Sequence, residues 1–162
     1  MDIEMFTLRI VQNQEKDSLN NIMQYYFYDF SEFLPIDVEQ NGSFKDYTEL
    51  DYYFNKRDSH VPYFIEVEGK LAGFVLVKRE ADETYSIAEF FIMKRYRKNG
   101  LGKSVALQVF DLYKGSWYVM QIKPNLPAQA FWRNVVQEYT NGQYKEEIEE
   151  KKIFQYFNNE NY

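Results

Sequence analysis

Cysteine is absent from the 162-residue sequence, and histidine occurs once, as His60. Without cysteine the chain can form neither a disulfide framework nor a thiolate metal site. One histidine is too few for a His-rich metal site or a His-based catalytic triad. We interpret His60, which lies shortly before Pro62, as an ordinary loop residue, and we expect no bound metal.

Long apolar segments are also missing, because no run approaches the roughly 18 residues that a transmembrane helix requires. The N-terminus carries Asp2 and Glu4 where a signal peptide would have a basic segment followed by an apolar one. The formal net charge of -6 disfavours nucleic-acid binding, which needs clustered Lys and Arg. The sequence therefore predicts a cytoplasmic protein without a membrane or nucleic-acid partner.

Aromatic residues, in contrast, are abundant, with 15 Tyr and 14 Phe in an aromatic fraction of 19%. Together with an apolar content of 45%, they are enough for a substantial core and are unlike the composition of a disordered chain. The length is typical of one domain, and no repeat, linker or low-complexity tract interrupts it. We expect residues 1–162 to form a single domain.

The first third of the chain predicts a strand followed by helices. Residues 5–11 form the strand, and a helix capped at Asp17 or Ser18 follows. Its apolar residues have helical spacing and occupy one face: Leu19, Ile22, Met23, Tyr26, Phe27 and Phe30. Residues 33–43 are expected to form a loop, and residues 45–55 a second, weaker helix.

The remainder of the chain alternates between strand and helix patterns. Strands are expected at residues 63–67 and 71–77, joined by a tight turn at Glu68-Gly69, and then at residues 85–93. A helix follows Gly102 and ends before Gly115. A strand at 117–122, a helix capped by Asn125, and strands at 144–148 and 153–157 complete the order. The helices on either side of strand 117–122 indicate that it runs parallel to strand 85–93, which predicts an α/β domain with a mixed sheet.

The segment between strand 85–93 and its following helix carries the chemistry. It consists of Arg97, Lys98, Asn99, Gly100, Leu101, Gly102, Lys103 and Ser104. Two glycines let the backbone approach a bulky anion, and the helix N-terminus offers unpaired N–H groups and the positive end of its dipole. The basic side chains add charge, so the segment is suited to hold a pyrophosphate.

Three motifs compete for this segment. A P-loop would require its first glycine at Arg97, and a dinucleotide fingerprint would require its last glycine at Val105. The pattern R-x-x-G-x-G fits at Arg97, Gly100 and Gly102, although so short a pattern is weak alone. An ordinary strand-to-helix turn stays open as a further reading.

The surroundings strengthen the third motif. Residues 88–102, AEFFIMKRYRKNGLG, resemble the central motif of the GNAT (N-acetyltransferase) family. Residues 125–132, NLPAQAFW, resemble the family's next motif, an Asn followed by Ala and an aromatic pair. The resemblance implies a GNAT-like fold: a mixed, mostly antiparallel sheet of about six or seven strands splayed at its centre, with about four helices.

The resemblance also implies that acetyl-CoA is the co-substrate and where it binds. Backbone groups of Phe91, Ile92 and Met93 would pair with the pantetheine arm, whether or not their side chains belong to the core. The pyrophosphate would lie on residues 97–102, with Lys103 and Ser104 in the first helical turn. Asn125 would cap its helix, contact the pantetheine, or do both, and Phe131 and Trp132 would line the CoA side, with core packing as the alternative for Phe131.

The implied reaction moves an acetyl group from a thioester to an amine, which must first lose a proton. Glu89 is the candidate base, since a carboxylate within an apolar strand is costly without a role or partner, and burial raises its pKa. A solvent-facing or Lys-paired Glu89 is the alternative. Many family members use a Tyr as acid where this chain has Trp132; Tyr139 is the nearest Tyr in sequence, and we assign no acid.

The acceptor is expected to enter over the first helices and their loop. Carboxylates and aromatic side chains that would suit a small cationic amine, such as a polyamine or an aminoglycoside-like molecule, gather in that part of the sequence: Tyr25, Tyr26, Tyr28, Asp29, Glu32, Phe33, Asp37, Glu39 and Asp51. Packing of the aromatics and solvation of the acids is the alternative. A protein or peptide N-acetyltransferase and a non-catalytic CoA-binding domain stay open as functions, as does a homodimer.

Overall fold

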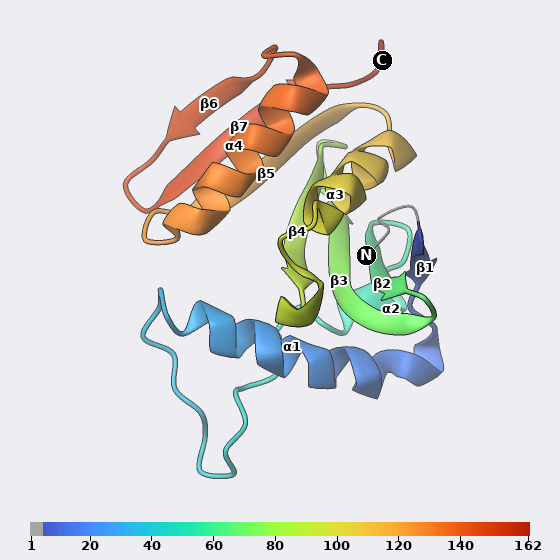
Figure 1. Cartoon of the computed structure of the whole chain (residues 1–162), viewed down its shortest axis with the longest axis vertical. Coiled ribbons are helices and arrows are strands. Elements are labelled where there is room, and N and C mark those ends of the chain that lie inside the picture. The colour runs from blue at the N-terminus through green and yellow to red at the C-terminus, as the bar shows by residue number, and fades with distance from the viewer. Residues whose placement is uncertain (1–4) are drawn as a thin grey trace.

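The computed structural model describes residues 5–162, in which seven strands form one sheet in the order β1-β2-β3-β4-β5-β7-β6 (Figure 1). The strands are β1 (Phe6–Ile10), β2 (His60–Val67), β3 (Lys70–Arg79), β4 (Tyr85–Ile92), β5 (Ser116–Ile122), β6 (Lys145–Ile148) and β7 (Lys152–Asn158). Neighbouring strands are antiparallel except β4 and β5, which are parallel. The mixed, mostly antiparallel sheet expected from the sequence is therefore confirmed.

Helices cover the two faces of the sheet. They are α1 (Lys16–Phe30), α2 (Tyr52–Asn55), α3 (Leu101–Leu112) and α4 (Leu126–Thr140), with 3-10 turns at Asn13–Glu15 and Lys94–Tyr96. One core lies between the sheet and α3 and α4, and includes Val105, Phe110 and Trp132. The other lies under α1 and α2, and includes Leu19, Met23 and Phe74. Within the described residues, no helix is both long and apolar enough to cross a membrane.

Several sequence expectations for the N-terminal third are wrong. The helix expected at residues 45–55 is confined to Tyr52–Asn55, because the preceding residues form turns. Asp17 and Ser18 do not cap α1; a 3-10 turn leads into the helix, and the Gln12 and Glu15 side chains form a capping box at that turn. His60 is buried at the start of β2, where the Ser59 hydroxyl lies 2.8 Å from its Nδ1, so it is not a loop residue.

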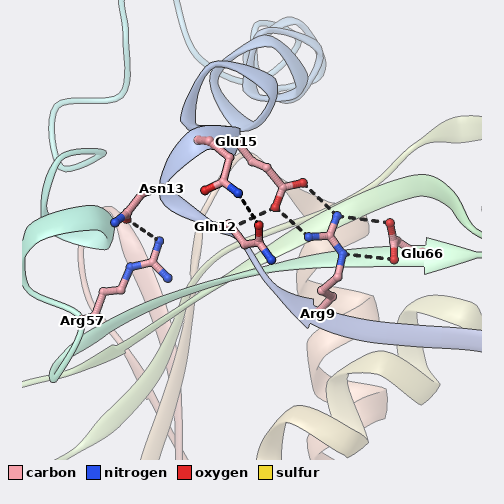
Figure 2. Close-up of polar contacts among 7 residues, drawn as sticks. Arg9, Gln12, Asn13, Glu15, Arg57 and Glu66 are labelled. Atoms are coloured by element: carbon pink, nitrogen blue, oxygen red, sulfur yellow. Dashed lines mark hydrogen bonds and ion pairs between the residues drawn. The ribbon is translucent and has the colours of Figure 1, made fainter.

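The region before α1 is fixed to the sheet by one arginine (Figure 2). The Arg9 guanidinium donates to both carboxylate oxygens of Glu15, at 2.6 and 2.9 Å, and to those of Glu66 on β2 at 3.3 Å. The Glu15 side chain in turn accepts from the Gln12 backbone N–H. These contacts join β1, the 3-10 turn and β2, and so set the direction in which α1 starts across the sheet.

The sheet opens between β4 and β5. Only Tyr85 and Ser86 of β4 pair with β5, opposite Trp117 and Tyr118. Beyond Ser86 the strands diverge: in Figure 1, β5 turns away from β4 together with β7, β6 and α4, while α1 crosses the open side. The edge of β4 from Ile87 to Ile92 therefore faces a gap in the sheet, which confirms the expected central splay.

A β-bulge in β4 changes which face its side chains occupy. Leu76 of β3 pairs with Glu89, but the next residue, Val77, pairs with Ile87, so Ala88 is the extra residue. With strict alternation, Ile87 and Glu89 would share a face. The bulge instead places Ile87 in the core under α3 and α4, and turns the Glu89 side chain toward α1.

Candidate functional site

A cavity of about 920 Å³ occupies the open part of the sheet. Its walls come from β4 and β5, the last two turns of α1 with the segment that follows, the N-terminus of α3, and the start of α4. The elements that resemble the family's motifs thus border the same space. Because the splay forms this space, the site depends on the loss of pairing between β4 and β5.

Most of the residues singled out in the sequence line this cavity. They are Glu89, Phe91, Ile92, Arg97, Lys98, Gly100, Gly102, Lys103, Asn125, Phe131 and Trp132. Four others do not line it: Met93, Asn99, Leu101 and Ser104. Leu101 is almost fully buried in the core, and the Asn99 side chain accepts from the Leu101 backbone N–H at 3.3 Å.

The N-terminus of α3 presents free backbone donors. Gly100 precedes the helix with a φ of 82°, which an L side chain rarely adopts, and Lys98 also has a positive φ of 70°. The first hydrogen bond between backbone groups is from Ser104 N–H to Gly100 C=O. Within the part of the chain that the structure describes, the N–H groups of Gly102 and Lys103 therefore have no acceptor and can bind an anion.

The neighbours of Gly102 also leave little space for a side chain at this position. A Cβ there would lie 3.2 Å from Cε1 of Phe131 and 3.8 Å from a side-chain carbon of Ile92. Phe131 itself packs against Phe90 and Trp132. The first turn of α3 therefore touches α4 closely, and a side chain at Gly102 would displace Phe131 toward the cavity.

Basic side chains surround this helix end, but they are not equally free. Arg97 is engaged: its Nη2 donates to Asp29 of α1 at 2.5 Å, and its Nε donates to the Ile92 carbonyl at 2.6 Å. Lys103 pairs with Glu138 at 2.7 Å. Lys98 is exposed and forms no ion pair with residues 5–162. Lys98 is thus the cation most available to a ligand here.

The open edge of β4 offers a second set of backbone groups. The Met93 N–H donates to Ala72 of β3, and successive residues of a strand point their backbone groups in opposite directions. Ile92 and Phe90 therefore direct their N–H groups into the gap. The Ile92 carbonyl already accepts from the Arg97 side chain. The donors that this edge offers to a ligand are the N–H groups of Phe90 and Ile92. The sequence had indicated Phe91, Ile92 and Met93.

Glu89 lies at the α1 side of the cavity and accepts a hydrogen bond from the buried hydroxyl of Tyr26. The pKa of Glu89 is raised to about 7, because burial, which raises it, outweighs the hydrogen bonds from Tyr26 and Tyr47, which lower it. Burial also raises the pKa of Tyr26 well above its ordinary value, so Tyr26 stays a donor. No Lys or Arg pairs with Glu89 in the described residues, so the Lys-paired alternative does not fit, and Glu89 is half-buried on the cavity wall.

Neither Trp132, at the position of the family's Tyr, nor Tyr139, the nearest Tyr in sequence, is placed to act as a general acid. Trp132 is 7% exposed and packs edge-to-face on Phe90, with ring centroids 5.2 Å apart. Tyr139 donates to Asp111 at 2.8 Å and is absent from the cavity wall. Tyr26 is the one tyrosine on that wall among the described residues.

Asn125 caps α4 by accepting from Ala128 N–H at 3.0 Å, and also borders the cavity.

The acceptor-side residues divide into two groups. Tyr26, Asp29, Glu32 and Phe33 line the cavity, whereas Tyr25, Tyr28, Asp37, Glu39 and Asp51 do not. Tyr25 and Tyr28 are exposed on the outer face of α1, and Asp51 pairs with Lys16. The Tyr26–Glu89 contact was not foreseen, because helical spacing assigns Tyr26 to the core without indicating what it faces, and nothing in the sequence marks the bulge that turns Glu89.

Comparison with known proteins agrees with this geometry. The sequence model described as the Acetyltransferase (GNAT) family matches residues 21–135, which is most of the chain. That range includes most of α1, the anion-binding segment at the N-terminus of α3 (residues 97–104, the cradle), and the aromatic pair of α4. No curated protein sequence matches the chain.

Solved structures of low sequence identity share the fold. One is a putative streptothricin acetyltransferase from Bacillus anthracis in complex with acetyl coenzyme A, with 13% identity and a TM-score of 0.62 over 97% of this chain and 99% of the other. Another is the ribosomal-protein-S18-alanine N-acetyltransferase from Escherichia coli, with 13% identity and a TM-score of 0.64 over 95% and 94%. A dodecameric spermidine N-acetyltransferase from Vibrio cholerae has 13% identity and a TM-score of 0.64 over 96% and 94%.

Proposed function

Since the chain belongs to the GNAT family of acetyltransferases, we propose that it transfers the acetyl group of acetyl-CoA to a primary amine of a small molecule, with Glu89 as the general base. The location of Glu89 is the observation that carries this proposal. It is a partly buried carboxylate without a cationic partner among the described residues, at the open edge of β4 and on the wall of the cavity.

The chain offers complementary groups for each part of acetyl-CoA. The pyrophosphate would be held by the N–H groups of Gly102 and Lys103 and by the Lys98 side chain. The pantetheine arm would pair with the open edge of β4 as an added strand, and would use one of the two N–H groups of Phe90 and Ile92. Phe131 lies over this path, and Asn125 borders it. Arg97 supports the site indirectly, because it holds the end of β4 against α1 through Ile92 and Asp29.

In the reaction, Glu89 takes a proton from the acceptor ammonium, whose pKa is near ~10, and leaves a neutral amine with a free lone pair. The nitrogen attacks the thioester carbonyl, and a free N–H of the β4 edge stabilises the resulting oxyanion. The C–S bond then breaks, the electron pair leaves on the thiolate of CoA, and one of the two protons on the attacking nitrogen is lost to water, so that the amide product keeps the other. A thiolate is a stable enough leaving group to depart without a dedicated acid.

Replacing Glu89 by Gln tests this assignment. Removal of a general base lowers the turnover number by about 100-fold to 10,000-fold, while the affinity for acetyl-CoA stays within about threefold of the wild type. Thiol release reports turnover, and calorimetry reports affinity. Glu147→Gln on the exposed strand β6 is the matched control. Unchanged turnover in Glu89→Gln would remove Glu89 from the mechanism.

The same pair of measurements separates the alternatives. A domain that binds CoA without catalysis would show acetyl-CoA affinity and no thiol release with any amine. A protein or peptide acetyltransferase would release thiol with an N-terminal peptide and not with small amines. The Glu89–Tyr26 pair on the cavity wall favours an active enzyme, since burying a carboxylate there has a cost in stability.

We retain a single domain over residues 1–162, a cytoplasmic location and a homodimer as proposals. Light scattering would test the homodimer.

A further inference from the structure

The α1 side of the cavity has a largely apolar wall. We call this part the acceptor lobe; its apolar side chains are Phe27 and Phe30 of α1, Phe33, Leu34 and Ile36 of the following segment, and Met120 of β5. None of these six side chains is fully buried, so each leaves apolar surface on the cavity. Exposed apolar surface that gathers in one concave site indicates a ligand with an apolar part.

The carboxylates of the lobe are few once their partners are considered. Asp29 carries Arg97 on one oxygen, at 2.5 Å, and has Lys94 within 4.0 Å of the other. Its charge is therefore compensated within the protein. Glu32 is exposed at the edge of the lobe. Glu89 is the remaining carboxylate, and in the proposed reaction it receives the proton of the amine that reacts.

The lobe thus offers Glu89 to one cationic nitrogen, while the other carboxylate without an ion pair in the described residues, Glu32, is exposed, so that water and salt screen its attraction for a second ammonium. A polyamine or an aminoglycoside carries further ammonium groups, each of which requires a carboxylate or water. In this lobe those groups would lie against Phe27, Phe33 or Ile36, where an unpaired charge loses its hydration without compensation. An apolar body, in contrast, would cover side chains that are now exposed to water.

We infer that the acceptor is a monoamine with an apolar body, such as an arylalkylamine or a long alkylamine, whose nitrogen lies at Glu89 and whose body lies on the acceptor lobe. This inference rests on the proposed function, and replaces the broader expectation of a small cationic amine. Phe30 is well placed in this arrangement, because its ring contacts that of Tyr26, with centroids 4.9 Å apart, and so continues the apolar wall up to the Tyr26–Glu89 pair.

A matched pair of amines tests the inference. Hexylamine and hexamethylenediamine have the same length and differ in one terminal group, a methyl or a second ammonium. We expect kcat/KM for hexylamine to exceed that for hexamethylenediamine by about tenfold or more, and phenethylamine to exceed spermidine by a larger factor. The substitution Ile36→Glu adds a carboxylate to the lobe, and is expected to reduce the preference for the monoamine of each pair.

Calorimetry with acetyl-CoA on the same protein distinguishes failure of the proposed function from failure of the inference about the acceptor. If acetyl-CoA does not bind to the folded protein, the proposed function itself fails. If acetyl-CoA binds and the diamine or spermidine is the better acceptor, only the inference about the apolar monoamine is overturned, whereas a peptide as the better acceptor would overturn the proposed small-molecule function as well. The same holds if acetyl-CoA binds and no alkylamine or arylalkylamine is acetylated. A higher kcat/KM for both monoamines, reduced in Ile36→Glu, supports it.

Discussion

At Glu89, burial and hydrogen bonding act on the pKa in opposite directions. Burial raises it, the hydroxyl of Tyr26 lowers it by stabilising the carboxylate, and the net pKa is about 7. A base must be ionised to accept a proton, so we expect kcat/KM to rise with pH through about 7 and then to level off with respect to this group. A pH–rate profile measures this rise in kcat/KM. Values of kcat/KM that do not change between pH 6 and pH 8, roughly one unit below and above the pKa, would contradict the assignment.

The substitution Tyr26→Phe isolates the contribution of the hydrogen bond. Without the donor, the pKa of Glu89 rises, and the acidic limb of the profile moves to higher pH. A hydrogen bond to a charged group is worth about 1.5 kcal/mol or more, so we expect roughly tenfold lower activity at neutral pH and recovery at higher pH. Tyr25→Phe, on the exposed face of the same helix, is the control and should leave the profile unchanged. Loss of activity at all pH values in Tyr26→Phe would instead indicate a damaged fold.

The same carboxylate should make the stability of the fold depend on pH. The pKa of Glu89 is 4.5 in an unstructured chain and about 7 in the fold, so the folded state holds its proton more tightly. Stability from this group is complete below about pH 4.5 and is lost as the pH rises through about 7. We expect Glu89→Gln, which stays neutral, to gain stability relative to the wild type between about pH 5 and pH 8. Urea midpoints of the two proteins at about pH 5 and pH 8 measure the change. An equal difference between Glu89→Gln and the wild type at both pH values would contradict the expectation.

At the scale of single elements, the splayed end of β4 depends on the glycine opposite it. A Cβ on Gly73 of β3 would lie 2.0 Å from the Phe91 carbonyl oxygen and 3.1 Å from Cα of Ile92. Since these are backbone atoms, a side chain at position 73 must push the end of β4 aside. That end carries the free donors proposed for the pantetheine.

We expect Gly73→Ala to lower the free energy of unfolding by about 1–3 kcal/mol and to weaken acetyl-CoA binding more than tenfold. Gly42→Ala is the control: its φ of 86° carries a backbone cost, but nothing lies within 4 Å of a Cβ there. It should lose stability through this backbone cost, without a clash, and keep the affinity for acetyl-CoA. Normal affinity in Gly73→Ala would show that the end of β4 is not part of the binding site.

Elements with strong local patterns could be predicted from the sequence. The β2–β3 hairpin follows from Glu68-Gly69, whose φ values of 51° and 77° suit a tight turn, and α1 and α3 follow from their apolar spacing. Features that depend on tertiary contacts could not be predicted. Residues 45–51 have no helix because tertiary packing decides their conformation, and the β4 bulge that turns Glu89 toward α1 leaves no trace in an apolar strand.

At the scale of the whole molecule, net charge conceals a local concentration of positive charge. The chain has 25 acidic and 19 basic residues, yet Lys94, Arg97, Lys98 and Lys103 all border the cavity at its α3 end. An overall negative charge therefore does not prevent the binding of an anionic co-substrate. Because these side chains are near solvent, their attraction for a phosphate should weaken as salt screens it.

The central claim is that acetyl-CoA binds along the open edge of β4 with its pyrophosphate at the N-terminus of α3. Calorimetric titration with acetyl-CoA tests it most directly, on the wild type, on Lys98→Glu near the N-terminus of α3, and on Lys70→Glu at the start of β3. Both lysines are exposed, so neither substitution should unfold the chain. We predict binding with a dissociation constant in the micromolar range for the wild type and Lys70→Glu, and about tenfold or weaker binding for Lys98→Glu. Absence of binding to the folded wild type, or equal affinity in all three proteins, would contradict the account.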